Sequence, residues 1–184
     1  MPLTVAIIGA GSLGRWLALS GAQAGFRVML EDVLPSNLHH ARQAIRKELN
    51  PDTPRSDSDA QVTLVSTIED AVRTADLAID CVPDELESKL EILWLLDRMA
   101  PPHTVFATPT TQLAIADLGA CTYRPEKCLA IGASPAELAG LAGTPGAQIV
   151  LRAAPATAPE TIALVAGFWR RLGFVPVVRN ELRP

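Results

Sequence analysis

The fold is decided by residues 5–14, which read Val-Ala-Ile-Ile-Gly-Ala-Gly-Ser-Leu-Gly. The apolar residues that lead into the glycines are typical of a parallel strand buried on both faces. Beyond the glycines, Leu13 and Leu17 recur at helical spacing in a run that extends to Ala24, and Gly25 is placed to end the helix. The stretch therefore predicts a strand, a tight glycine-rich turn and a helix in immediate succession.

The glycines of this turn, Gly9, Gly11 and Gly14, have the spacing G-x-G-x-x-G. Gly9 allows the tight turn, Gly11 lets a pyrophosphate approach the backbone, and Gly14 lets the helix pack closely against the strand. Free N–H groups around Ser12 and Leu13 favour an anion, because the positive end of the helix dipole lies there. We therefore expect these residues to bind the pyrophosphate of a dinucleotide. In the alternative interpretation, the turn only connects a strand to a helix and binds nothing.

An acid follows the second predicted strand, Phe26 to Leu30. Asp32 stands where a carboxylate would accept hydrogen bonds from the hydroxyls of the adenosine ribose. A 2′-phosphate about 4 Å from that carboxylate would cost about 1 kcal/mol per charge in water and about 4 kcal/mol at an effective dielectric constant of about 20. The residue therefore predicts NAD rather than NADP, unless a cation such as Arg27 or Arg42 intervenes.

Strands and helices continue to alternate along the chain. Further strand-like runs are Val62–Ser66, Leu77–Cys81, Thr104–Ala107, Leu129–Ile131, Gln148–Leu151 and Val175–Val178. The helical stripes between them are Leu38 to Leu49, a short helix after Thr67, Leu86 to Trp94, and Pro159 to Leu172. This rhythm predicts an α/β fold with a doubly wound, mostly parallel sheet, and we expect residues 1–184 to form a single dinucleotide-binding domain.

Length and composition argue against several other classes of protein. The chain has 184 residues, 48% of them hydrophobic and 20% charged, with a net charge of −4. A net acidic chain lacks the basic face that nucleic acid requires, and no apolar run reaches the ~18 residues that a bilayer span needs. The three cysteines, at unrelated spacings, indicate neither a disulfide framework nor a metal site. We therefore expect a cytoplasmic protein that binds neither nucleic acid nor a membrane.

Beyond the glycine turn and its acid, three further stretches resemble the NAD-binding domain of the 3-hydroxyacyl-CoA dehydrogenase family. Residues 80–86 read Asp-Cys-Val-Pro-Asp-Glu-Leu with Lys89 after them, where the family has Glu-Ala-Val-Pro-Glu-Asn-Leu followed by Lys. Residues 108–113, Thr-Pro-Thr-Thr-Gln-Leu, stand where the family has Ser-Asn-Thr-Ser-Ser-Leu, and residues 124–126 repeat its Arg-Pro-Glu. The resemblance covers nearly the whole chain in order.

This resemblance implies a nicotinamide-dependent oxidoreductase of fatty acid metabolism, with NAD(H) as the bound cofactor. It also implies that Val82, Pro83, Asp84 and Lys89 lie along the nicotinamide half of the NAD site. The sequence alone leaves a second interpretation open for Lys89, which is that of a solvated lysine on a helix surface.

The chain departs from the family at the catalytic positions. There the family has a His, in His-Phe-Phe-Asn-Pro, that acts as the general base, and a Glu downstream that orients it. The His position falls here on Ile131 or Gly132 and the Glu position near Gly143, none of which can accept a proton. We therefore predict no catalytic residue, and a general base is typically worth about 10²–10⁴ in rate. The family's longer helical pair is replaced by one helix and the polar loop Pro51–Asp59, and its all-helical C-terminal domain has no counterpart in this sequence.

Two functions remain, besides the alternative in which nothing binds. In the first, the chain is an NAD-binding protein of this family without the usual dehydrogenase activity by itself. In the second, it is an NAD-dependent oxidoreductase of a 3-hydroxyacyl-CoA or another small hydroxy or keto substrate. Thr111, Lys89 or a separate partner chain would then supply the proton path. A homodimer is compatible with either function.

Overall fold

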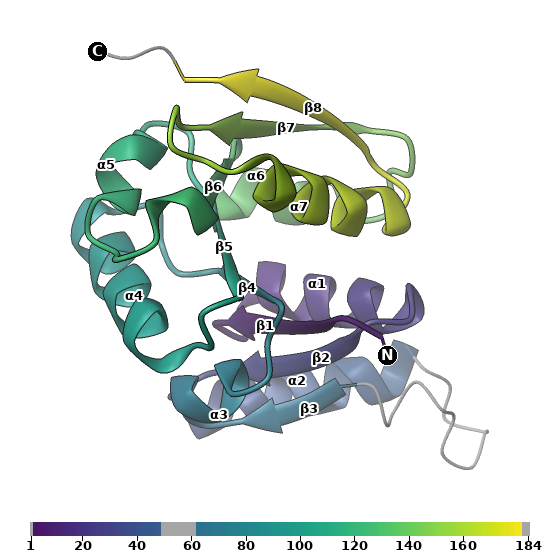
Figure 1. Ribbon diagram of the computed structural model, residues 1–184. Coiled ribbons are helices and arrows are strands. Elements are labelled where there is room, and N and C mark those ends of the chain that lie inside the picture. Colours follow the sequence, from purple (N-terminus) through teal and green to yellow (C-terminus); the bar gives the residue numbers. More distant parts are fainter. Residues whose placement is uncertain (1, 49–61, 182–184) are drawn as a thin grey trace.

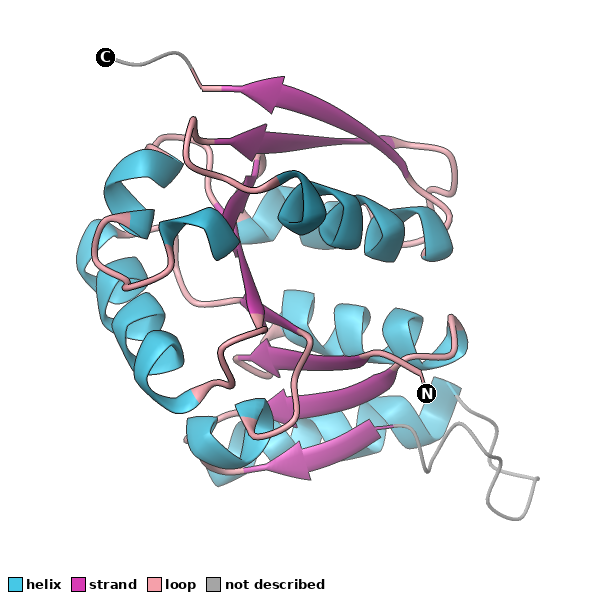
Figure 2. Ribbon diagram, in the orientation of Figure 1, coloured by secondary structure: helices cyan, strands magenta, loops and turns pink. Residues whose placement is uncertain are grey.

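One eight-stranded sheet runs through the molecule, with β1 and β4 side by side near its middle (Figures 1 and 2). The computed structural model describes residues 2–48 and 62–181. The strand order is β3-β2-β1-β4-β5-β6-β7-β8, and all neighbours are parallel except β6 and β7. The predicted doubly wound, mostly parallel sheet is confirmed. The strands are β1 Thr4–Ile8, β2 Arg27–Glu31, β3 Val62–Val65, β4 Leu77–Asp80, β5 Val105–Pro109, β6 Cys128–Ile131, β7 Gln148–Ala153 and β8 Val175–Asn180.

Helices cover the sheet on both faces. One buried apolar cluster joins the sheet to α1, α2, α6 and α7, and a second joins its other face to α3, α4 and α5. The faces are separate because successive residues of a strand point to opposite sides of the sheet. The helices are α1 Ser12–Gln23, α2 Pro35–Glu48, α3 Ile68–Val72, α4 Leu86–Met99, α5 Ile115–Gly119, α6 Pro135–Gly140 and α7 Pro159–Arg171, with a 3₁₀ turn at Pro125–Lys127.

Two short helices, α5 and α6, were not predicted from the sequence patterns. α6 starts with a capping box, in which Ser134 Oγ accepts from the Glu137 N–H and the Glu137 carboxylate accepts from the Ser134 N–H. The sequence carried this signal, because Ser134 is followed by Pro135 at the first helical position and by Glu137 three residues on. Leu49 and the predicted loop Pro51–Asp59 lie outside the described residues.

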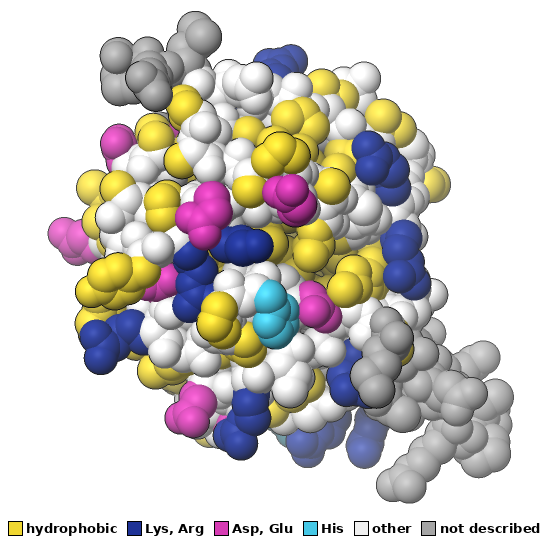
Figure 3. Space-filling view, viewed as in Figure 1, with side chains coloured by type: hydrophobic (Ala, Val, Ile, Leu, Met, Phe, Trp, Pro, Cys, Tyr) yellow, Lys and Arg dark blue, Asp and Glu magenta, His cyan; other side chains and the backbone are white. Residues whose placement is uncertain are grey.

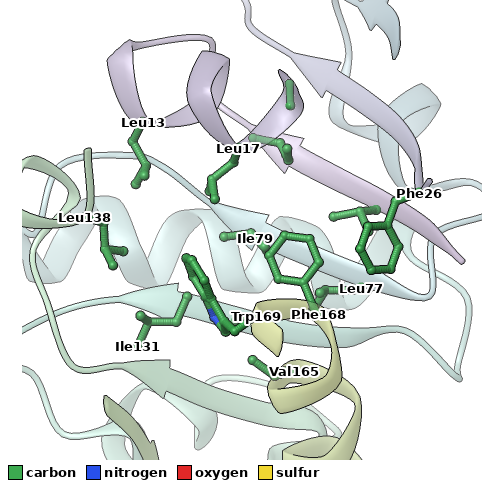
Figure 4. Packing of buried hydrophobic residues seen from close by; sticks show 14 of the residues in the cluster. Leu13, Leu17, Phe26, Leu77, Ile79, Ile131, Leu138, Val165, Phe168 and Trp169 are labelled. Atoms are coloured by element: carbon green, nitrogen blue, oxygen red, sulfur yellow. The ribbon is translucent and has the colours of Figure 1, made fainter. Parts of the chain in front are cut away.

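Aromatic packing holds α7 against α1 over the sheet (Figure 4). Trp169 of α7 is fully buried, and its ring centroid lies 6.3 Å from that of Trp16 on α1. Phe168 lies 5.2 Å from Phe26, which leads into β2, and Leu17 of α1 points into the same cluster. This packing fixes α1, and with it the turn that connects α1 to β1.

The Arg-Pro-Glu stretch has a structural role at the end of α4. The Arg124 guanidinium donates to the Asp97 carboxylate (2.8 Å) and to the backbone oxygens of Asp97 (2.5 Å) and Pro101 (2.5 Å). The last carbonyls of a helix lack helical partners, and a cation at that end also interacts favourably with the helix dipole. The Arg124 side chain therefore caps the carboxyl end of α4 and holds this helix beside the segment that leads into β6.

Acidic and basic side chains are interspersed on the face shown in Figure 3. None of the helices in residues 2–48 and 62–181 is long and apolar enough to cross a membrane.

Candidate cofactor site

The predicted cofactor residues meet at one edge of the sheet. The chain moves outward from β1 to β2 and β3, and then returns to place β4 on the other side of β1. Ligands of open α/β sheets bind outside the carboxyl ends of the strands at such a reversal. The glycine turn follows β1, Asp32 follows β2, and residues 81–85 follow β4, so all three segments lie at this edge.

Two of the three glycines in the turn cannot be replaced without strain, one because of its backbone conformation and one because of a close contact. Gly9 has a φ of +103°, in the region that favours glycine, and its N–H donates to the Glu31 carbonyl (2.8 Å). A Cβ on Gly14 would lie 1.8 Å from the Gly9 carbonyl oxygen, so α1 approaches the turn more closely than any side chain allows. A Cβ on Gly11 would have no heavy atom within 4 Å, so the backbone there is open to a ligand.

The start of α1 fits an anion. Gly11 precedes the helix without a side-chain cap, and the first turn contains no acidic residue. The Arg15 N–H donates to the Gly11 carbonyl (3.0 Å), which leaves the N–H groups before Arg15 without helical partners. Ser12 is exposed, whereas the Leu13 side chain is buried in the core, so only the backbone of Leu13 can face a ligand. This open, uncapped helix start fits the pyrophosphate of a dinucleotide.

Asp32 joins the glycine turn to the start of α2. Its Oδ2 accepts from the Ala10 N–H (2.8 Å) and from the Asn37 side-chain amide (2.9 Å), and its Oδ1 accepts from the Leu34 N–H (2.9 Å). A carboxylate offers about four acceptor positions, so capacity remains for a ribose hydroxyl. Arg27 is the first residue of β2, so it lies at the amino end of the strand, whereas Asp32 follows its carboxyl end. Arg27 therefore cannot offset the charge of Asp32. The sequence did not reveal the contribution of Asn37.

The segment after β4 is tied to the segment after β5. Asp84 Oδ2 accepts from the Thr111 N–H (3.0 Å) and lies 3.4 Å from Thr111 Oγ1. Val82 is half-buried and Pro83 is exposed. Asp84 thus ties the segment that the family resemblance associates with the nicotinamide half of the site to the segment of Thr111.

Lys89 is neither a solvated lysine nor an exposed ligand group in this structure. Its side chain is fully buried, and its Nζ donates to Asp80 Oδ1 (2.6 Å) and to the Val82 carbonyl (3.3 Å). Asp80 is equally buried; burial raises the pKa of its carboxyl, and the Lys89 ammonium opposes that rise. Lys89 therefore anchors the start of the segment between β4 and α4 through its contacts with Asp80 and Val82.

Across the sheet, Gly132 faces β7. The Gly132 N–H donates to the Val150 carbonyl (2.8 Å), and a Cβ on Gly132 would lie 3.2 Å from Val150 Cγ1. Gly143, where counting along the sequence places the family's Glu, is exposed in the loop after α6. The side chain next to position 132 is thus Val150, and neither residue can transfer a proton.

The histidines and Cys81 could in principle take part in catalysis, but they either lie away from the predicted cofactor residues or are unreactive. His39 and His40 belong to α2, and His103 precedes β5, with its Nε2 3.7 Å from Asp76 Oδ1. Burial raises the pKa of the Cys81 thiol, so it stays protonated. In the part of the chain that the structure describes, no group of three or more His, Cys, Asp or Glu residues could hold a metal ion.

The family profile described as the NAD binding domain of 3-hydroxyacyl-CoA dehydrogenase matches residues 4–182. The chain belongs to this family. A probable 3-hydroxybutyryl-CoA dehydrogenase of Bacillus subtilis is 30% identical over 133 residues, which are 68% of this chain and 46% of that protein. The 5-formyl-3-hydroxy-2-methylpyridine 4-carboxylate 5-dehydrogenase of Mesorhizobium japonicum is 29% identical over 181 residues, 95% of this chain and 56% of that protein.

Solved structures show the same fold. The (S)-3-hydroxybutyryl-CoA dehydrogenase of Ralstonia eutropha superposes with a TM-score of 0.83 at 21% identity, covering 99% of this chain and 65% of that chain. The chain spans about half the length of the curated relatives it matches, 46% and 56% of the two above. It is thus an NAD-binding domain of the 3-hydroxyacyl-CoA dehydrogenase family, and NAD is its cofactor.

A second acid of this NAD-binding domain, Glu31, was not singled out from the sequence. It is the last residue of β2 and is 2% exposed, and its Oε1 is buried without a hydrogen-bond partner among the described residues. Burial, together with the neighbouring Asp32 charge, raises the pKa of Glu31 from 4.5 to about 7. Two adjacent carboxyl groups, one on the last residue of β2 and one directly after it, therefore stand at the predicted adenosine end of the site.

Replacement of Gly14 by Ala is expected to destabilise the NAD-binding domain by several kcal/mol, because the new Cβ would overlap the Gly9 carbonyl oxygen. Replacement of Gly11 by Ala is the matched control, since its Cβ would meet no atom. We expect Gly11→Ala to have the same midpoint of urea unfolding as the wild-type protein but to bind NADH more weakly. Equal stability of the two variants would contradict the close approach of α1.

Replacement of Lys89 by Met is expected to cost about 3–5 kcal/mol in the free energy of unfolding, because it leaves the buried Asp80 carboxylate unpaired. The double variant Asp80→Asn/Lys89→Met removes both charges and is expected to recover most of that stability. If Lys89 acts only by holding the β4–α4 segment, the double variant also recovers NADH affinity in calorimetry. Recovery of stability without recovery of NADH affinity would instead make Lys89 a direct contact of the cofactor.

The stability of the domain is expected to fall between about pH 5 and about pH 8 because of Glu31. The carboxyl titrates near 4.5 in the unfolded chain and near 7 in the folded protein, so over this range the unfolded state loses its proton first. The full difference amounts to about 3 kcal/mol. Glu31→Gln removes this titrating group. In urea unfolding, the free energy of unfolding of Glu31→Gln minus that of the wild-type protein should therefore rise with pH and then level off. A pH-independent difference would contradict the raised pKa.

Proposed function

We propose that this chain is an NAD-binding domain that does not catalyse the oxidation of 3-hydroxyacyl-CoA by itself. The observation that carries the proposal is the lack of a titratable side chain at Ile131 and Gly132, on one of which the resemblance places the family's His. Val150, which lies beside Gly132, has no titratable group either. Without a general base, the proton of a substrate hydroxyl has no acceptor in that place.

The binding half of the site supports the retention of cofactor. The glycine turn, the uncapped start of α1 and the Asp32 carboxylate have the chemistry that a dinucleotide requires. NAD+ when bound supplies the hydride acceptor of an oxidation. The residues of this chain would hold its pyrophosphate at α1 and its ribose at Asp32, while Lys89 and Asp84 hold the segments beside its nicotinamide half.

A second candidate is an oxidoreductase that uses a different proton path, and one contact favours it. Thr111 Oγ1 lies 3.4 Å from Asp84 Oδ2 at the carboxyl edge of the sheet, so a substrate hydroxyl near Thr111 would have a carboxylate within reach. Lys89 is a weaker candidate for this path, because its amine is buried and already bound to Asp80. The substrate of such an enzyme would be a 3-hydroxyacyl-CoA or another small hydroxy or keto compound.

We also propose that residues 1–184 form one dinucleotide-binding domain of a cytoplasmic protein, linked through its family to fatty acid metabolism. A homodimer or a separate partner chain could complete the substrate side, where the curated relatives are longer than this chain. No nucleic acid or membrane partner is proposed.

Calorimetric titration with NADH and NADPH, followed by an activity assay, tests the proposed function. The wild-type protein is expected to bind NADH at least about tenfold more tightly than NADPH, because the Asp32 carboxylate repels a 2′-phosphate. Asp32→Asn should reduce that ratio, whereas Asp117→Asn, which changes an exposed carboxylate of α5, should not. With NAD+ and 3-hydroxybutyryl-CoA, we expect no formation of NADH above the rate without protein.

A rate of NADH formation that depends on 3-hydroxybutyryl-CoA and weakens in Asp32→Asn would contradict the proposal. Loss of that rate in Asp84→Asn or Thr111→Val would then assign it to the second candidate. Absence of NADH binding would leave the glycine turn as a structural connection only.

A further inference from the structure

Glu31 is a buried acid that the interactions described above leave without a partner. It is 2% exposed, and no described residue donates to its Oε1. A buried carboxyl without a hydrogen bond is costly, and its pKa of about 7 reflects that cost. Among the described residues, the charged group that shifts the pKa of Glu31 is Asp32, which is also acidic. Such a group is expected to be retained where a bound molecule supplies the missing donor.

The register of the sheet shows which way Glu31 points. Glu31 pairs with Ile8, which in turn pairs with Asp80, so the three side chains project to the same face. Ile8 lies in the apolar cluster of α3, α4 and α5. Asp32 instead reaches Ala10 and Asn37 on the side of α1 and α2. The two acids therefore serve opposite sides of the same sheet edge, and Glu31 cannot simply duplicate the contacts of Asp32.

Apolar side chains stand at the carboxyl edge on both sides of β1. Val33 and Leu34, directly after β2, are 71% and 53% exposed, and Leu86, after β4, is 49% exposed. These are three of the most exposed large hydrophobic residues in the described part of the chain. Planar apolar surfaces of a ligand are favoured between such side chains. This edge of the sheet thus carries exposed apolar side chains and a buried acceptor without a partner among the described residues.

The adenine of a dinucleotide matches this combination. It has two apolar faces, and its 6-amino group is a hydrogen-bond donor on its edge. With the pyrophosphate at α1 and the ribose at Asp32, the residues at the ends of β2 and β4 would be the ones next to the base. We propose that Glu31 accepts a hydrogen bond from the 6-amino group of this adenine, and so selects the base of the cofactor. The inference rests on the binding of NAD at the glycine turn.

The hypoxanthine analogue of NAD+ tests the proposal, because an oxygen acceptor replaces the 6-amino donor. At about pH 8.5 the Glu31 carboxyl is ionised and can only accept, so the wild-type protein is expected to bind the analogue about tenfold more weakly than NAD+ in calorimetry. Glu31→Val removes the acceptor and should bind both dinucleotides with similar affinity. Glu31→Gln, whose amide can donate as well as accept, should also lose the preference and serves if Glu31→Val does not fold.

Glu160→Gln is the matched control, since it removes one exposed negative charge on α7, far from this edge, and should keep the tenfold preference. Equal affinity of wild-type protein for NAD+ and the analogue would overturn the role of Glu31 and leave NAD binding intact. The same holds if Glu31→Val or Glu31→Gln keeps the preference. Loss of NAD+ binding altogether by the wild-type protein would overturn both this inference and the proposed function.

Discussion

The close approach of α1 to the end of β1 is the contact on which the site depends. A Cβ on Gly14 would lie 1.8 Å from the Gly9 carbonyl oxygen, so backbone packs directly on backbone there. This approach brings the free N–H groups of the helix to the carboxyl edge of the sheet. Asp32 then holds the turn through the Ala10 N–H, and the buried Trp169 of α7 packs against Trp16 of α1. A displaced helix would lose its place beside the second strand as well as its anion site.

Local signals in the sequence were sufficient for the sheet and the glycine turn. The apolar run Leu77–Cys81, for example, forms β4 at Leu77–Asp80, because a strand buried on both faces has to be apolar along its length. The role of Lys89 could not be predicted in this way. Helical spacing places it on α4, but its amine is neutralised by Asp80, nine residues earlier on the preceding strand. Only the packing of α4 on the sheet brings the two charges together.

The proton-transfer position shows a second limit of counting along the chain. Alignment by sequence places the family's Glu near Gly143, which lies in the loop after α6. The antiparallel pairing of β6 and β7 brings Val150, and not Gly143, next to Gly132. Glu31 was missed for a similar reason. In the sequence, two adjacent acids at the end of a strand look like a single polar strand end, so only Asp32 was singled out. The register with Ile8 shows that the two carboxyl groups project to opposite faces.

Cofactor binding and proton transfer are separable in this fold because they lie on different strands. The glycine turn follows β1, Glu31 and Asp32 lie at the end of β2, and residues 81–85 follow β4. Gly132 follows β6 and Val150 lies on β7, in the other half of the sheet, where the two residues pack together. A substitution there would leave the glycine turn undisturbed. The positions of Gly132 and Val150 are therefore independent of the glycine turn and Asp32, so a domain with this fold can hold NAD whether or not these positions carry a proton acceptor.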